Sequence, residues 1–275
     1  MGSSVISLGL GLGGGKAATS SGRLAGGAGG GDQLAYPNGL FTSSNFVIDV
    51  QPVYHFDASI LDGASASNNP SDGTAVSTWG NRSGQSTDYD AIQSTANRQP
   101  VFRGNYLEFD GFTDFLTVNN SPGFTKDAAF TLITVAYKEG TTVSFAPVGR
   151  NPRINSYYLP LNFTNGVTYF LDNSNASVST AGYGPHFNSI QQFVLTKDTS
   201  NNGNYFLQGN NSYKSYTRAD TISGAFGTIG HNGYYHYGRI YEVLLFDSLL
   251  SNANLNVIRT YFNTKYTDLP ASTSF

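Results

Sequence analysis

The sequence contains no cysteine. The chain therefore has no disulfide bond, no thiolate metal ligand and no cysteine nucleophile. A domain of this size can fold without disulfides, so the absence of cysteine does not indicate a cellular compartment.

Charged residues are also scarce: they make up 12% of the 275 residues, and the net charge is −3 at pH 7. Nucleic-acid-binding proteins carry a basic patch or stripe, and without one we expect no nucleic-acid partner. No run of 18 apolar residues occurs, so we expect no membrane-spanning segment. We expect no secretory signal either, because the apolar stretch 5–12 has no basic flank and is interrupted by Gly9 and Gly11.

Residues 1–45 form a glycine-rich arm with no pattern that could close a core. Its leucines alternate with glycine, which is the period of an extended strand. Ordering glycine costs more backbone entropy than ordering any other residue, so contacts with another chain would have to offset that cost. We predict that the arm anchors the protein to a neighbouring chain through Val5, Ile6, Leu8, Leu10 and Leu12. A flexible leader and an arm packed on its own domain are the alternatives.

Residues 46–268 have the pattern of one all-β domain, followed by a short tail over residues 269–275. Short apolar runs alternate with turns rich in Gly, Asn and Asp, which predicts an antiparallel β-sandwich of the jelly-roll type. A hairpin is expected over residues 194–209. The predicted strands are VYHFDAS (53–59), NYLEFD (105–110), DFLTVN (114–119), FTLITVAYK (130–138), GVTYFLD (166–172), QQFVLTKD (191–198), NYFLQGN (204–210) and RIYEVLLFD (239–247).

A short helix is predicted after the last of these strands. Ser251 can cap its first turn, and Leu255, Ile258 and Phe262 then form one apolar stripe. Lys265 falls in the last turn, where a cation interacts favourably with the helix dipole.

The strand and helix at the end of the chain carry a recognisable signature. Its positions are Glu242, Val243, Leu244, Leu245, Phe246, Asp247, Leu250, Ser251, Tyr261, Phe262, Lys265 and Tyr266. Four further motifs precede it in order: FDAS (56–59), DGTAVSTWGNRSG (72–84), RQPVF (98–102) and LEFDGFTDFL (107–116). Together they resemble concanavalin A-like lectin/glucanase domains of the laminin-G-like branch, of the kind found in bacterial and phage surface proteins.

The resemblance covers about residues 50–267 and implies a jelly roll of two packed antiparallel sheets. It implies little about function, because this fold is shared by lectins, hydrolases, lyases and structural modules. Glycanases of this fold carry a Glu-x-Asp-x-x-Glu run, and here Glu108 and Asp110 are followed by Thr113 at the third acidic position. We therefore predict no catalytic residues and a protein that is not an enzyme.

A metal site is not predicted either. The four histidines, His55, His186, His231 and His236, form no helical metal-binding pair, and each is expected to pack in the core or lie on the surface. Calcium is a possible exception, because jelly rolls of this family often bind it through loop carboxylates. The candidate oxygen donors are Asp57, Asp62, Asp72, Asp110 and Asp114, although aspartate is also the usual residue for turns.

The best candidate for a binding site is the tyrosine-rich stretch GHNGYYHYGRIYE (230–242). Tyrosine combines a large apolar ring with a polar tip, which suits a sugar ring or a protein partner. A second such stretch is NPRINSYYLPLNF (151–163). The predicted ligand-binding residues are Asn232, Tyr234, Tyr235, His236 and Tyr237 from the first stretch, and Tyr157 and Tyr158 from the second. The alternative is that most of these tyrosines pack into the sheets.

From these observations we predict a structural or decoration protein of a large assembly, with a phage virion as the first choice. The arm would bind other chains of that assembly, such as a capsid or tail protein, and the jelly roll would be displayed on the particle. The alternative is a carbohydrate-binding module, free or at a cell surface, that recognises a host-surface glycan. A glycan hydrolase or lyase is the third hypothesis.

Overall fold

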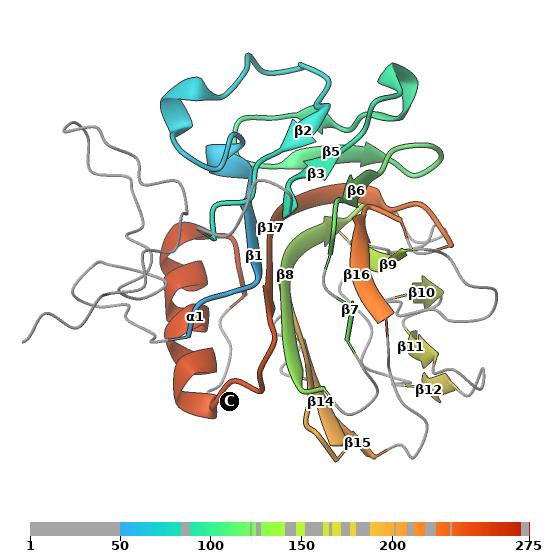
Figure 1. Ribbon diagram of the computed structural model, residues 1–275, viewed down its shortest axis with the longest axis vertical. Helices are drawn as coiled ribbons and strands as arrows, with labels where there is room; N and C mark the ends of the chain where they lie inside the picture. Colours follow the sequence, from blue (N-terminus) through green and yellow to red (C-terminus); the bar gives the residue numbers. More distant parts are fainter. Residues whose placement is uncertain are drawn as a thin grey trace, which may run out of the picture.

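In the computed structural model, the chain forms two packed antiparallel β-sheets, with one helix against the outer face of the larger sheet (Figure 1). The structure describes residues 50–83, 89–121, 123–124, 128–140, 147–151, 162–164, 167–171, 177–179, 188–200, 202–207, 212–217, 224–231, 233–270 and 275. The predicted sandwich with a C-terminal helix is confirmed. The predicted arm, with its anchoring residues between Val5 and Leu12, lies outside the described residues.

The larger sheet has eight strands, in the order β15-β14-β13-β8-β17-β5-β4, and β1 also pairs with β17. The long strand β17 makes this possible, because its residues 237–240 pair with β5 and its residues 242–245 pair with β1. The strands are β1 (Tyr54–Asp57), β4 (Val101–Phe102), β5 (Leu107–Asp110), β8 (Phe130–Lys138), β13 (Ile190–Lys197), β14 (Asn202–Leu207), β15 (Ser212–Thr217) and β17 (Tyr237–Phe246).

The second sheet has six strands, in the order β2-β3-β6-β16-β7, with β9 also paired to β16. Its strands are β2 (Thr78–Trp79), β3 (Ala91–Ile92), β6 (Leu116–Val118), β7 (Gly123–Phe124), β9 (Val148–Asn151) and β16 (Gly224–Ile229). A separate three-stranded sheet contains β10 (Asn162–Thr164), β11 (Val167–Leu171) and β12 (Ser177–Ser179). Short 3-10 helices span Ala58–Ile60, Ala66–Asn68 and Ala96–Arg98.

Each of the eight segments predicted as a strand overlaps a strand, and the predicted hairpin is formed by β13 and β14. The sequence analysis missed the two-residue strands, which are too short to show a period of two. It also missed the longer strands β9, β10, β12, β15 and β16. In β16, glycine occupies two of the six positions, and glycine is typical of turns.

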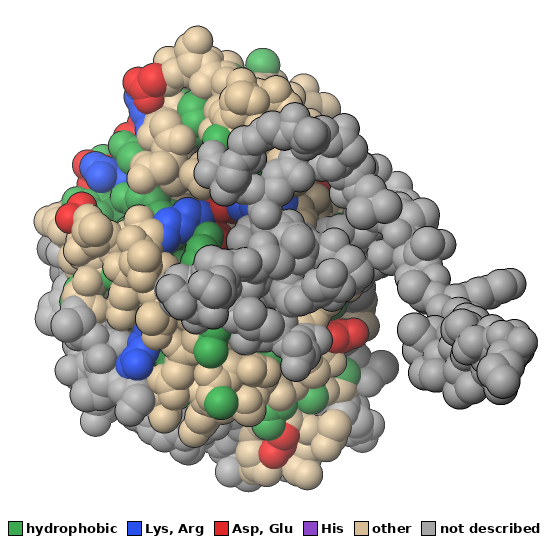
Figure 2. Space-filling model, turned by 90° about the vertical axis from the view of Figure 1, so that its left-hand side faces the viewer, with side chains coloured by type: hydrophobic (Ala, Val, Ile, Leu, Met, Phe, Trp, Pro, Cys, Tyr) green, Lys and Arg blue, Asp and Glu red, His purple; other side chains and the backbone are tan. Residues whose placement is uncertain are grey.

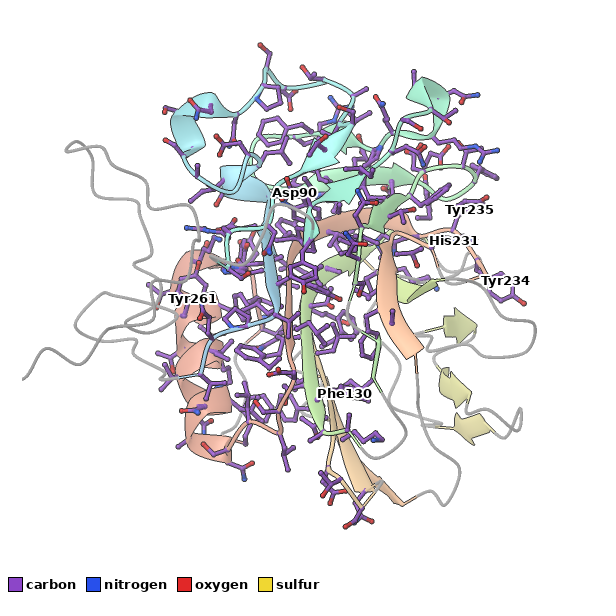
Figure 3. The ribbon with its side chains drawn as sticks, viewed as in Figure 1. Asp90, Phe130, His231, Tyr234, Tyr235 and Tyr261 are labelled. Atoms are coloured by element: carbon purple, nitrogen blue, oxygen red, sulfur yellow. The ribbon has the colours of Figure 1, made fainter. Side chains whose placement is uncertain are left out.

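Two hydrophobic cores pack on the two faces of the larger sheet. The inner core lies between the sheets and includes Trp79, Phe56 and Phe130, and Figure 3 shows Phe130 in this interior. The outer core lies between the larger sheet and helix α1 (Asn252–Lys265). Because β8 and β17 are buried on both faces, their sequences read as nearly continuous apolar runs.

Helix α1 begins as the sequence predicts. The Ser251 hydroxyl accepts a hydrogen bond from the backbone N–H of Asn254, at 3.2 Å. Leu255, Ile258 and Phe262 are buried and form the predicted stripe against the larger sheet. On the face that carries this helix, most of the described surface is uncharged (Figure 2). Among the described residues, no helix is long and apolar enough to cross a membrane.

Candidate functional site

The loop between β16 and β17 brings aromatic side chains together at one corner of the sandwich. The rings of His231 and Tyr235 lie 4.6 Å apart, and the ring of Phe115, from the neighbouring β5–β6 loop, lies 5.7 Å and 6.4 Å from them. Figure 3 shows that Tyr234 projects outward beside them. We call Phe115, His231, Tyr234 and Tyr235 the aromatic corner.

The backbone of this loop is tightly held. Gly230 has a φ of +82°, and a Cβ atom there would lie 2.3 Å from the ring of Phe109, so only glycine fits. The Gly230 N–H donates to the carbonyl of Pro147, and the Gly230 carbonyl accepts from the N–H of His236. The Thr228 hydroxyl donates to the carbonyl of His231, at 2.5 Å. These bonds preform the loop, which lowers the entropy cost of binding a ligand.

The two loops at this corner also expose large apolar side chains. Of the described residues, the exposed large hydrophobic side chains are Phe112 (72% exposed), Tyr234 (50%) and Leu249 (48%). Phe112 belongs to the β5–β6 loop, where the Asp110 carboxylate accepts hydrogen bonds from three backbone N–H groups and so shapes the turn. Two of the three exposed side chains therefore lie on adjoining loops.

The predicted tyrosine cluster is divided by the alternation of β17. Tyr237 is half-buried at the start of the strand, whereas His236 points into the core with its ring edge towards Phe109. His236 is fully buried, and burial lowers its pKa to about 3, so its ring is uncharged. His236 is therefore a core residue and is not available to a surface ligand. Asn232, Tyr157 and Tyr158 lie outside the described residues.

A network of charged side chains is buried under the C-terminal end of α1. The ammonium of Lys265 lies 2.7 Å from a carboxylate oxygen of Asp57 and 2.7 Å from one of Glu242. Arg82 donates to Asp57, and the Tyr266 hydroxyl donates to Glu242 at 2.7 Å. The buried ring of His55 also hydrogen-bonds Glu242, at 2.5 Å. We call these six residues the buried ion network.

A β-bulge positions Glu242 in this network. The pairing of β17 with β8 shifts register between Ile240 and Glu242, so the strand carries one extra residue, Tyr241. Tyr241 and Glu242 consequently both face the outer side of the larger sheet. There Glu242 lies opposite Asp57 of β1, which faces the same side.

The network also contains the one group of potential metal ligands found among the described residues. Atoms of His55, Asp57 and Glu242 all lie within 4.8 Å of one another. Lys265 and Arg82 already contact these carboxylates, however, so the chain's own cations occupy the place of a metal ion. Burial alone would raise the pKa of Asp57, but Lys265 and Arg82 outweigh it and hold that pKa below its usual value.

The other predicted calcium ligands have separate roles. The Asp62 carboxylate accepts hydrogen bonds from backbone N–H groups of its own turn, and Asp72 lies 3.5 Å from Arg103 on the surface. Asp110 shapes the β5–β6 turn. Asp114 accepts from the N–H of Asp110, and burial together with the Asp110 charge raises its pKa to about 6. Within the described part of the chain, no three of the five predicted calcium ligands lie close enough together to bind one ion.

The carboxylate pair considered for catalysis is likewise engaged in structural contacts. Glu108 accepts a hydrogen bond from Arg103 Nε at 2.8 Å, and Asp110 opens the turn. Sequence reasoning also missed a residue on the outer face of the larger sheet. This is Arg239, whose guanidinium lies over the rings of Tyr106 and Tyr137. Arg239 lies in the candidate stretch 230–242, but the two rings come from β8 and from the residue before β5, so no local sequence pattern marks this contact.

No protein-family model matches the sequence, and no curated protein matches it. The structure is similar to Trypanosoma rangeli sialidase in complex with sialic acid, with a TM-score of 0.53 and 14% identity. This match covers 78% of the chain and 33% of the sialidase chain. The structure is also similar to the receptor-binding domain of botulinum neurotoxin D, with a TM-score of 0.49 and 14% identity, over 77% of this chain and 52% of that one.

The chain thus spans about a third of the sialidase and about half of the neurotoxin chain. At this level of identity the similarity to the sialidase shows the fold alone. That fold is a concanavalin A-like β-sandwich, in agreement with the resemblance of the sequence motifs.

Proposed function

We propose that this protein is a non-enzymatic carbohydrate-binding module that contacts its ligand through the aromatic corner. The observation that carries the proposal is the exposure of Tyr234 in the aromatic corner, on a loop held by backbone hydrogen bonds. Phe112 adds a second exposed aromatic ring on the adjoining loop. Exposed aromatic rings can stack on the apolar face of a sugar, while the tyrosine hydroxyl offers a hydrogen bond to the sugar hydroxyls. Such recognition needs few charges, which agrees with the charged content of 12%.

The anchoring role of residues 1–45 rests on the sequence alone and stays a prediction. It is compatible with the proposed function, because anchoring and sugar binding would use different parts of the chain. A virion protein that displays a lectin-like sandwich would combine the two roles.

We expect Tyr234→Ala and Tyr235→Ala to weaken glycan binding about tenfold or more, which corresponds to ~1.4 kcal/mol or more of binding free energy. The reason is that each substitution removes one of the aromatic rings that would contact the sugar. The measurement is a glycan array with the wild-type protein, followed by titration calorimetry of the best ligand with each variant.

The matched control is Leu249→Ala, which removes an exposed apolar side chain from the segment between β17 and α1. Its affinity should equal that of the wild type. The proposal is wrong if no glycan binds, or if the tyrosine variants bind as tightly as the Leu249 variant.

A further inference from the structure

We propose that the outer face of the larger sheet around Arg239 is a second binding site, which takes the carboxylate of an acidic sugar. The inference rests on the proposed function for its class of ligand, a sugar, but it uses residues outside the aromatic corner. Four side chains carry it: Arg239, Tyr106, Tyr137 and Tyr237. We call them the Arg239 site.

Two tyrosines from neighbouring strands flank the guanidinium. Its central carbon lies 4.4 Å from the ring centre of Tyr137 in β8 and 5.0 Å from that of Tyr106, which directly precedes β5. Because β17 lies between β8 and β5 in the sheet, these rings hold Arg239 from its two sides. All three side chains are only partly buried, so the group reaches the surface. The rings fix the guanidinium in place through cation–π attraction.

Arg239 forms no ion pair within the described part of the chain. Its side chain hydrogen-bonds that of Tyr241, but its Nε atom is buried without a hydrogen-bond partner. The carboxylate of its cross-strand neighbour, Glu108, is bound instead to Arg103 at 2.8 Å. A buried donor without a partner costs about 1–3 kcal/mol, and in native proteins such a group calls for a specific explanation. An incoming anion at the exposed end of the guanidinium would balance its charge.

The geometry favours a carboxylate on a sugar ring. A planar guanidinium donates two parallel hydrogen bonds to a carboxylate, which gives a defined orientation. Tyr237 precedes Arg239 by two residues and so faces the same side of the sheet, which places a third tyrosine beside the charge. One arginine among tyrosines suits a single anionic group on an otherwise uncharged ring. A nucleic acid backbone would need several basic side chains.

The test is titration calorimetry with oligomers of galacturonate, guluronate and mannuronate, each compared with its uncharged methyl ester. We expect the wild type to bind at least one of the acids at least tenfold more tightly than its ester. Arg239→Gln should remove this preference, and Arg239→Lys should restore it only in part, because an ammonium lacks the planar fork. Unfolding in urea, followed by the fluorescence of buried Trp79, confirms that each variant is folded.

The matched control is Arg98→Gln, which makes the same charge change at an exposed arginine of the 3-10 helix Ala96–Arg98, outside the Arg239 site. Its affinity for the acids should stay within twofold of the wild type. The inference is wrong if acids and esters bind equally, if Arg239→Gln and Arg98→Gln weaken binding equally, or if dextran sulfate binds more tightly than every uronate. Binding that is lost in Tyr234→Ala but kept in Arg239→Gln would support the proposed function and overturn this inference.

Discussion

Replacing Lys265 with methionine is expected to lower the free energy of unfolding by about 3–5 kcal/mol. The ammonium of Lys265 lies 2.7 Å from both Asp57 and Glu242, and these carboxylates are 1% and 0% exposed. Methionine keeps much of the apolar volume but leaves the two buried carboxylates with Arg82 as their one remaining full positive charge in the network. Urea unfolding measures the loss, with Trp79, the only tryptophan, as the fluorescent probe.

The matched control is Arg103→Met, which breaks the exposed pair with Glu108, whose side chains are each 37% exposed. Exposed ion pairs are worth about 0–1 kcal/mol, so this variant should stay close to the wild type. Lys265→Arg keeps the positive charge and should lose less stability than Lys265→Met. A loss for Lys265→Met no larger than that for Arg103→Met would show that the buried ion network does not depend on its lysine.

The buried ion network joins residues from motifs that lie far apart in the sequence. Asp57 belongs to FDAS, Arg82 to the WGNRSG segment, and Glu242 and Lys265 to the C-terminal signature. The sequence analysis found these motifs by their order and spacing, and the fold they imply is correct. It related Lys265 to the helix dipole and Asp57 to a possible calcium site, because ion pairs across 23 or more residues leave no local pattern.

The strands were predictable for a simple physical reason. The run 130–138 is mostly apolar and rich in β-branched residues, and such a run between turns is typical of a buried strand. The same continuity hides which face each residue occupies. The bulge at Tyr241 adds to the problem, because it reverses the alternation between Ile240 and Glu242 without any mark in the sequence.

The candidate binding residues were less predictable, because neighbours in sequence are not neighbours on the surface. Tyr235, His236 and Tyr237 are consecutive, yet they lie in the aromatic corner, in the core and at the Arg239 site, respectively. Conversely, Tyr106, Tyr137 and Arg239 come together only because β5, β17 and β8 are adjacent in the sheet. Strand order is the information that a single sequence does not contain.

The uncharged His236 makes the free energy of unfolding depend on pH. Between pH 7 and pH 4.5 we expect it to lower that free energy by about 2–3 kcal/mol, and a substitution of His236 should remove this decrease. Its pKa is about 3 in the folded protein, because burial disfavours the charged ring, and about 6.5 in an unfolded chain. Below pH 6.5 the unfolded chain therefore binds a proton that the folded protein does not. The contribution of the uncharged ring to the free energy of unfolding is therefore present above pH 6.5 and is lost as the pH falls towards 3. Burial also lowers the pKa of His55, so this histidine too lowers the free energy of unfolding as the pH falls.

The measurement is urea unfolding of the wild type and His236→Gln at several pH values between 7 and 4.5, a range above the ordinary pKa of Asp and Glu. Glutamine is of similar size and cannot take up a proton, so the variant should start less stable at pH 7 but decline less steeply. The matched control, His231→Gln, removes a half-exposed histidine of the same loop and should keep the wild-type slope. If the free energies of unfolding of His236→Gln and the wild type fall in parallel with pH, His236 takes up its proton equally in the folded and unfolded states. The assignment of His236 to a closed core would then be wrong.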